Sequence, residues 1–420
     1  MEILSTGEKI KRARIFKGIT LKELCDTKIS IAKMSCVENG KIKADKELLQ
    51  YVAEKMDIDI DYLLEDVFDQ LTNNLDNLRK NASCDAEAEE KLQNNIDYSI
   101  KYGYYNLGFE FMHILFLYYI EQNKMEKIQL IVSQYYDLFQ RNNTEENTII
   151  YFKDMAQYFS NNNEYIEAIS YYGKLREIIV QRESYNKSEY CMIGYNEALC
   201  YLKLSKYEEA YTILAEIIDY VDTIELLENR GMIYHIYACV CIKLKKENEV
   251  LYKEKAYEYQ KHNPISLAVA KGNYGKYYFE ISNKEMAIKE IEEGIELFPK
   301  DNNEKQVEFL NYCIEILIDN EEYDKAYNIA ENALNMAIIS GNIKLVEKSY
   351  YLKGSILQKK GRYKEAEKYM TLSLDSLFKF GSRQERKSRY MDMAKLYYEL
   401  GDTIDSLKYF NLSFAVDKKI

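Results

Sequence analysis

One short motif recurs along the chain at intervals of roughly 40 residues, a spacing typical of helical repeats. Each copy predicts a turn followed by the start of a helix. A small residue in this first turn of the helix faces the neighbouring helix. The copies stand at residues 163–168, 205–210, 283–287, 322–326, 361–366 and, more loosely, 401–406. Such repetition predicts an all-α solenoid of stacked helical hairpins. A stack of this kind forms a concave groove, and grooves of this kind hold peptides.

Small residues also pair inside each repeat. Twelve positions before the small residue of five copies stands a second one, namely Ala156, Ala198, Gly275, Gly354 and Ala394. Two facing small residues allow two helices to approach closely. This internal spacing resembles that of tetratricopeptide repeats, with a period longer than the usual 34 or so residues. The resemblance implies a right-handed solenoid of about eight hairpins over residues 97–420, with less regular units at 104–139 and 231–259.

Composition supports an all-helical protein and excludes several classes of site. Only two prolines occur, and proline breaks helix interiors. Eight cysteines include no C-x-x-C pair, so we expect neither a metal nor another cofactor. Without a signal-peptide pattern at residues 1–10, we expect a cytoplasmic protein with reduced thiols. The longest apolar run, residues 109–120, predicts a buried helix, because a membrane span needs about 20 residues.

The first 46 residues are basic in an otherwise acidic chain. They hold 11 Lys or Arg residues against six Asp or Glu residues, whereas the whole chain has a net charge of −12. Helix-capping patterns at Ser5, Thr20, Ser30, Asp45 and Asp59 predict five short helices within residues 1–66. Residues 67–96 are mixed and polar, and we expect a connector helix and hinge there. A basic head suggests contact with nucleic acid.

The head resembles the Cro/C1-type helix-turn-helix family. The matching residues are Leu21 to Leu24, Ile29 and Ser30, Met34 to Lys41, and Ile58 to Leu64, in the family's order. In that family the third helix lies in the major groove of double-stranded operator DNA. By position, the resemblance places Ile31, Ala32, Lys33 and Cys36 toward the bases, with Met34 and Val37 in the core. The candidates for phosphate contact are Lys22, Lys28, Lys41 and Lys43.

In tetratricopeptide repeats the first helix of each hairpin lines the concave side. Counting from the small residues then predicts a set of groove-facing side chains rich in amides, which can pair with a peptide main chain. The set is Asp154, Gln157, Tyr195, Asn196, Asn273, Lys276, Asn311, Tyr351, Asp392 and Lys395. Asn311 belongs to a unit whose register slips by one residue. Alternatively, these Asn residues reflect only a composition rich in Asn, Lys, Ile and Tyr.

Head and repeats together resemble the peptide-pheromone regulators of Gram-positive bacteria known as the RRNPP family. The resemblance implies a cytoplasmic homodimer that binds operator DNA and is switched by a short linear peptide, with dimer contacts from the head and the last repeats. Phage arbitrium receptors share this design. A scaffold that binds a folded protein is the rival class. We do not expect an enzyme, because the three histidines lack ligand-spaced partners and no phosphate loop or nucleophile elbow occurs.

Overall fold

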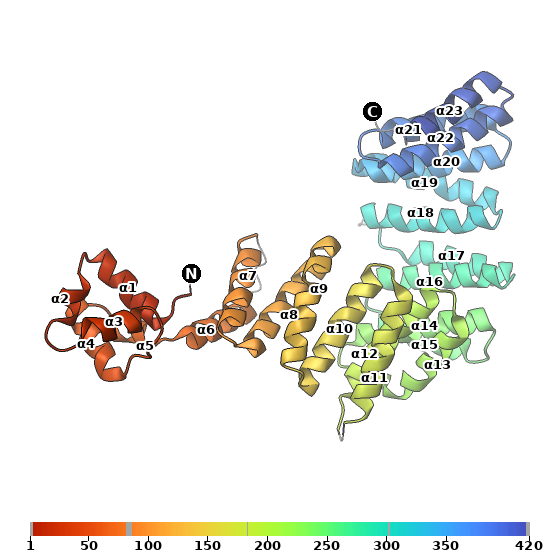
Figure 1. Cartoon of the computed structure of the whole chain (residues 1–420). Helices are drawn as coiled ribbons and strands as arrows, with labels where there is room; N and C mark the ends of the chain where they lie inside the picture. The colour runs from red at the N-terminus through yellow and green to blue at the C-terminus, as the bar shows by residue number, and fades with distance from the viewer. Residues whose placement is uncertain (1–2, 81–85, 183, 301–302, 417–420) are drawn as a thin grey trace. The chain divides into compact units, whose positions relative to one another are not determined.

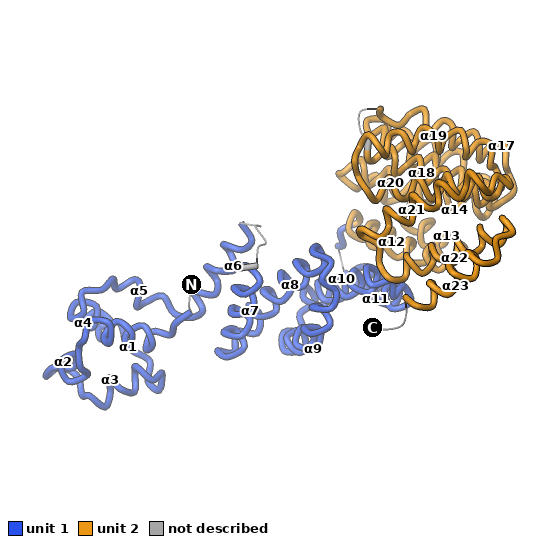
Figure 2. The backbone as a smooth tube through the Cα atoms, turned by 90° about the horizontal axis from the view of Figure 1, so that it is seen from above, with its two compact units in different colours: residues 1–186 blue, residues 187–420 orange. Residues whose placement is uncertain are grey.

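A computed structural model describes residues 3–80, 86–182, 184–300 and 303–416 (Figure 1). Within these ranges the chain forms 23 α-helices and one short 3₁₀ helix, with no β-strand. The all-α fold is therefore as expected. The chain divides into two compact units, residues 1–186 and 187–420, which are coloured separately in Figure 2.

The N-terminal head of the first unit contains the five expected helices. Each begins at its expected cap, where the side chain of Ser5, Thr20, Ser30, Asp45 or Asp59 accepts a hydrogen bond from a backbone N–H. The helices are α1 (Thr6–Phe16), α2 (Leu21–Cys25), α3 (Ile31–Glu38), α4 (Lys46–Met56) and α5 (Ile60–Leu64).

The core of the head confirms Met34 and Val37 as buried residues. The sequence predicts a first helix with Ile10, Ala13 and Ile15 on its buried side and Lys9 on its outer side, and two of these expectations are wrong. Ile15, expected in the core, is 59% exposed, whereas Lys9, expected outside, is buried. Lys9 can be buried because its Nζ donates to the carbonyl oxygens of Tyr62 and Glu65, at 2.7 and 2.8 Å.

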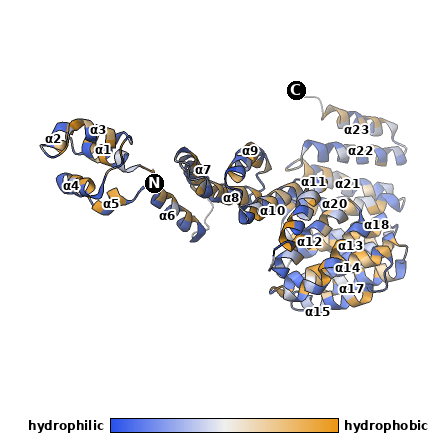
Figure 3. Cartoon of the chain, turned by 60° about the horizontal axis from the view of Figure 1, so that its bottom comes forward, coloured by the Kyte–Doolittle hydropathy of each residue, from blue (hydrophilic) through white to orange (hydrophobic). Residues whose placement is uncertain are grey.

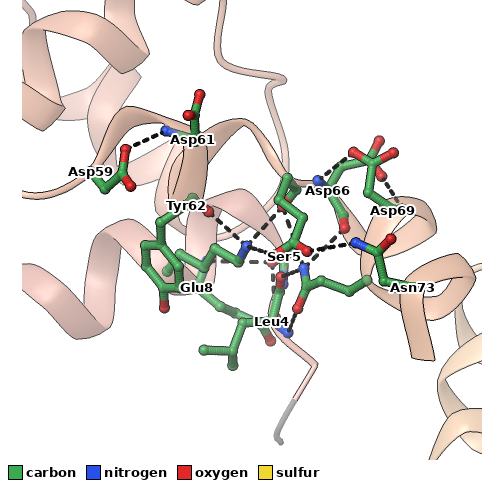
Figure 4. A network of polar contacts seen from close by, with 12 residues as sticks. Leu4, Ser5, Glu8, Asp59, Asp61, Tyr62, Asp66, Asp69 and Asn73 are labelled. Atoms are coloured by element: carbon green, nitrogen blue, oxygen red, sulfur yellow. Dashed lines mark hydrogen bonds and ion pairs between the residues drawn. The ribbon is translucent and has the colours of Figure 1, made fainter. Parts of the chain in front are cut away.

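A network of polar contacts ties the start of the chain to the end of the head (Figure 4). The side-chain amide of Gln70 accepts from the N–H of Leu4 and donates to its carbonyl oxygen, at 3.1 and 2.8 Å. Ile3 is buried in the same apolar cluster as Val67 and Leu71 of the next helix. The head is thus joined to the helix that follows it by its N-terminal segment as well as by the chain itself.

Residues 67–96 are not a single connector helix. They belong to two helices, α6 (Val67–Lys80) and α7 (Ala86–Lys101), and α7 packs against α8 (Tyr105–Glu121). The domain boundary expected at residue 97 therefore lies inside α7, because the apolar side chains Leu92 and Ile96 continue the helical packing surface. The apolar run 109–120 lies in α8, with Phe109, Phe111 and Phe116 buried as expected.

Eight successive helix pairs follow in the described chain, of which the first unit contains two and the second six. The pairs are α8 with α9 (Met125–Arg141), α10 (Glu145–Asn161) with α11 (Tyr165–Val180), α12 (Lys187–Lys203) with α13 (Tyr207–Ile217), α14 (Leu227–Leu244) with α15 (Glu249–Gln260), α16 (Pro264–Glu280) with α17 (Lys284–Leu297), α18 (Asn303–Asp319) with α19 (Tyr323–Ser340), α20 (Ile343–Lys359) with α21 (Tyr363–Leu377), and α22 (Arg383–Glu399) with α23 (Thr403–Ala415).

The tight turn inside every pair explains the recurring motif. Each turn has one residue with a left-handed backbone, and φ ranges from 53° to 81°. Only two of these residues are glycine, although side chains rarely adopt this conformation. The residues are Asn123, Asn163, Ser205, Lys245, Ser282, Glu321, Gly361 and Gly401. Asn123 and Lys245 mark the two units that the sequence motif leaves irregular.

The paired small residues bring the two helices of a hairpin together. A Cβ atom on Gly275 would lie 2.9 Å from the carbonyl oxygen of Ala287, so only glycine fits at this crossing. In the loosest copy of the motif, Ser406 donates a hydrogen bond to the carbonyl oxygen of Ala394 at 2.8 Å. Close helix approach is thus the physical reason for the small residues in both halves of the repeat.

Candidate functional site

The second unit contains a groove of about 640 Å³ between the first helices of its later hairpins. Side chains from α16, α18, α20 and α22 line it, and α21 contributes Tyr363 and Met370. The polar and charged lining consists of Lys276, Tyr312, Glu315, Asp319, Tyr351, Ser355, Gln358, Lys359, Asp392, Lys395 and Glu399.

The floor of the groove is apolar, and its rim is polar. Ile316, Leu352 and Met370 are buried side chains of the floor. Figure 3 shows α22, which lines one side, mostly in the hydrophilic colour. An apolar floor with a few oriented polar groups is the usual make-up of a ligand site.

Polar side chains on the first helices bind their counterparts on the next hairpin. Asn273 of α16 donates to Nε2 of His235 on α14 at 3.2 Å and accepts from the hydroxyl of Tyr312 on α18 at 2.7 Å. Burial lowers the pKa of His235 to about 4, so its ring is neutral at pH 7 and can accept this hydrogen bond. The three residues form a bridge across three hairpins.

A second set of such bonds joins α20 to α22. The hydroxyl of Tyr351 donates to Asp392 at 3.1 Å, and the amide of Gln358 donates to Glu399 at 2.7 Å. The guanidinium of Arg389 lies 3.3 Å from the centre of the Tyr351 ring and 3.5 Å from the Asp392 carboxylate. Burial nevertheless raises the pKa of Asp392, because desolvation outweighs these favourable contacts.

The groove contains four of the residues expected from the sequence, namely Lys276, Tyr351, Asp392 and Lys395. Asn273 lies on the same helix as Lys276, one turn earlier, but its amide is engaged by the bridge to His235 and Tyr312. Tyr312 lines the groove and was missed by counting. The one-residue slip in α18 was the signal that could have found it.

Two expected groove residues of this unit are buried instead. Asn311 is only 4% exposed, because the slip turns it toward α20, where it accepts a hydrogen bond from Ser349 at 3.2 Å. Tyr195 is 6% exposed, and burial raises its pKa to about 12. Its neighbour Asn196 is half-buried, and its side chain has no hydrogen-bond partner among the described residues.

Asp154 and Gln157 belong to α10 in the first unit. Asp154 is also buried rather than groove-facing, because it accepts hydrogen bonds from Tyr135 at 2.7 Å and from Nδ1 of His113 at 2.6 Å. Gln157 is half-buried. Neither residue is among those that line the groove of the second unit.

The head presents its expected DNA-facing residues at the surface. Ile31, Ala32 and Lys33, at the start of α3, are exposed, and Cys36 is half-buried. All four lysines expected at phosphates are exposed, namely Lys22, Lys28, Lys41 and Lys43. Lys33 lies 3.9 Å from Asp45, which caps α4, so its ammonium group is only loosely held.

Comparisons with known proteins agree with the repeat. A tetratricopeptide-repeat family model matches residues 347–376, which lie in α20, α21 and the turn between them. No curated protein sequence matches the chain.

Several solved structures are similar to the chain at low identity. The apo form of the quorum sensor NprR from Bacillus thuringiensis is 14% identical, with a TM-score of 0.43, and the match covers 79% of this chain and 98% of that one. PlcR of Bacillus thuringiensis, in complex with the peptide PapR7 and DNA, is 18% identical, with a TM-score of 0.30 and coverage of 61% and 94%. A Rap protein complexed with competence and sporulation factor is 15% identical, with a TM-score of 0.43 and coverage of 83% and 97%.

None of the helices in the described residues is both long and apolar enough to cross a membrane. Nor do these residues include a group of three or more His, Cys, Asp or Glu side chains placed to hold a metal ion.

Proposed function

We propose that this chain is a transcription regulator that binds operator DNA through its head and is switched by a short linear peptide in the groove of the second unit. The observation that carries the proposal is the groove itself, with its apolar floor and its polar rim from four successive hairpins. An extended peptide can place side chains on such a floor while the rim groups contact its main chain. The hydrogen bonds from Tyr351 to Asp392 and from Gln358 to Glu399 orient these two carboxylates along the groove wall.

The DNA-binding part of the proposal is supported by charge and exposure. The basic excess lies in the first 46 residues, and the start of α3 is open to solvent. A helix of this kind can enter the major groove, where Ile31 and Ala32 could contact a thymine methyl group and Lys33 a base or phosphate. In the PlcR structure, a peptide and DNA are present together. We infer the same pair of partners for this chain from its own head and groove.

The test uses the full-length protein and DNA from upstream of its own gene. Lys33→Ala should weaken binding by about 1 kcal/mol, or roughly fivefold, because one exposed contact is lost. Lys364→Ala, on an exposed site of α21, is the matched control and should leave binding unchanged. Fluorescence anisotropy at fixed salt measures both, and unchanged affinity for Lys33→Ala would remove this lysine from the interface.

The peptide part is tested by calorimetry with peptides encoded by a short open reading frame beside the gene. Binding by one of them, and a change in DNA affinity on its addition, are the expected results. Failure of every such peptide, together with tight binding to a folded protein, would favour the scaffold function instead.

We also propose a homodimer that works in the cytoplasm, with contacts through α23. This helix exposes Ile404, Leu407, Phe410 and Phe414, and an exposed apolar surface of this kind marks an interaction site. Light scattering should give twice the monomer mass for the wild type. The double variant Ile404→Glu, Leu407→Glu should yield monomers. An unchanged dimer would show that the interface does not involve this surface of α23.

A further inference from the structure

Three lysines line the groove with ammonium groups that form no ion pair or hydrogen bond to the described residues. Lys276 of α16, Lys359 of α20 and Lys395 of α22 are all exposed lining residues. Within the described part of the chain, none of them has an ion pair or a hydrogen bond through its ammonium group. Each comes from the first helix of a different hairpin.

The acidic groups of the groove, in contrast, are mostly engaged by the protein. Glu315 forms an ion pair with Lys348, Glu399 accepts from Gln358, and Asp392 accepts from Tyr351. Asp319 is the acidic lining residue that lacks a partner among the described residues. Lys348 and Arg389 neutralise two of the four lining carboxylates, at Glu315 and Asp392. The three lysines therefore face two carboxylates without a cationic partner, Asp319 and Glu399, and the groove has a small positive excess, although the whole chain has a net charge of −12.

Lysines at other crossings between hairpins of this unit are paired. Lys243 binds Glu280 on the next hairpin, Lys325 binds Glu292, and Lys360 binds Asp324. These lysines are exposed or half-exposed, as the groove lysines are, so exposure alone does not explain the difference. The three groove lysines, in contrast, form no ion pair within the described chain, and the carboxylates of a bound peptide would supply one.

We propose that the ligand of the groove is an anionic peptide. Its carboxylates, from Asp or Glu side chains or from the C-terminus, bind Lys276, Lys359 and Lys395, and an apolar side chain packs on Ile316, Leu352 and Met370. This inference rests on the proposed peptide-binding function and specifies the class of peptide. Charge complementarity of this kind raises association rates and makes binding sensitive to salt.

The size of the effect follows from exposure. An ion pair at a solvent-exposed rim changes affinity by roughly fivefold or less. Replacing Lys276 and Lys395 together by alanine should therefore weaken binding of an anionic peptide by roughly tenfold. Raising the salt concentration should weaken binding to the wild type more than to the double variant, because the variant has fewer charges to screen.

The experiment exposes the full-length protein to three pools of synthetic seven-residue peptides. Every peptide has one fixed Phe, and the remaining positions are drawn from Ser and Leu with Asp, with Lys, or with neither. Each pool is made with free and with amidated C-termini. Gel filtration separates the protein with its bound peptides, and mass spectrometry identifies them. Retention mainly from the Asp pool is the expected result. Loss of retention on amidation would show that the C-terminal carboxylate of the peptide is one of the groups that bind the lysines.

Retained peptides are then titrated against the wild type and two variants. The Lys276→Ala, Lys395→Ala double variant should lose about tenfold in affinity. Lys364→Ala, outside the groove, should match the wild type, and circular dichroism checks that each variant is folded. Equal retention from the Lys or neutral pools would overturn the anionic preference and leave the peptide-binding function standing. Retention of no peptide from any pool would count against that function and this inference together.

Discussion

Two regions of the second unit differ in whether their lysines form ion pairs. Between α15, α16 and α17, the buried Glu290 binds two buried lysines, Lys253 and Lys271, the latter at 3.1 Å. Tyr257 donates a further hydrogen bond to Glu290 at 3.0 Å. In the groove, a few helices away, the lysines have no such partners. A buried charge is costly unless the fold supplies a partner of opposite charge. A charge that faces solvent is hydrated by water and stays available to a ligand.

The pKa values of the two carboxylates differ in the same sense. Burial alone raises the pKa of Glu290, but the hydrogen bond and charge of Lys253, with the charge of Lys271, hold its pKa below the usual value. At Asp392 burial dominates, and the pKa is raised. Ion pairs therefore outweigh burial at Glu290, whereas burial outweighs the contacts of Asp392 with Tyr351 and Arg389.

The largest effect should come from breaking the ion pairs of Glu290. Glu290→Ala leaves the buried Lys253 without its anion and Lys271 with Glu293 alone, which should destabilise the unit by about 3–5 kcal/mol. Chemical denaturation followed by circular dichroism measures this. Glu292→Ala, two positions away, removes an exposed ion pair with Lys325 and should cost about 1 kcal/mol or less. Similar losses for both variants would contradict the comparison.

The contribution of Glu290 should also depend on pH. Because its folded pKa is lowered, its stabilisation is complete above its unfolded value of about 4.5 and is lost as pH falls through the lower folded value. The free-energy difference between wild type and Glu290→Gln should therefore be large at pH 7 and shrink in acid. Denaturation curves across this range measure it, and a difference that does not change with pH would mean that Glu290 is not ionised in the fold.

A smaller effect on stability should distinguish Asn273 from Asn196, the two asparagines that occupy the same position in their repeats. Asn273→Ala leaves the buried His235 and the hydroxyl of Tyr312 without their partner, which should cost about 1–3 kcal/mol of stability. Asn196→Ala removes a side chain with no partner among the described residues and should change stability by about 0.5 kcal/mol or less. Thermal unfolding measures both variants. Equal losses would show that Asn196 also has a structural role.

The smallest effect on stability is expected in the groove itself. Replacing Lys276, Lys359 and Lys395 together by alanine should change the free energy of unfolding by about 0.5 kcal/mol or less, because no ion pair is lost. The same denaturation experiment measures it. A loss of several kcal/mol would mean that these lysines hold the fold together, and would remove the basis for assigning them to a ligand.

The sequence predicted the head better than it predicted the groove. Ser30 and Asp45 determine where α3 and α4 begin through hydrogen bonds to residues three positions away, so local reading suffices. Lys9 was misplaced because its partners, the carbonyl groups of Tyr62 and Glu65, lie more than 50 residues further along the chain. Only the packing of α1 against α5 brings them together.

In the repeats, the sequence by itself determined the hairpins, their turns and the helix that faces the groove. The turn positions and paired small residues repeat in the sequence because each hairpin meets the same steric limits. Tertiary structure decided which side chains on that face are available. The slip in α18 replaced Asn311 with Tyr312, and bonds to neighbouring hairpins engaged Asn273 while leaving Lys276 and Lys395 open. Such bonds join residues about 40 positions apart, and their geometry depends on how neighbouring hairpins stack.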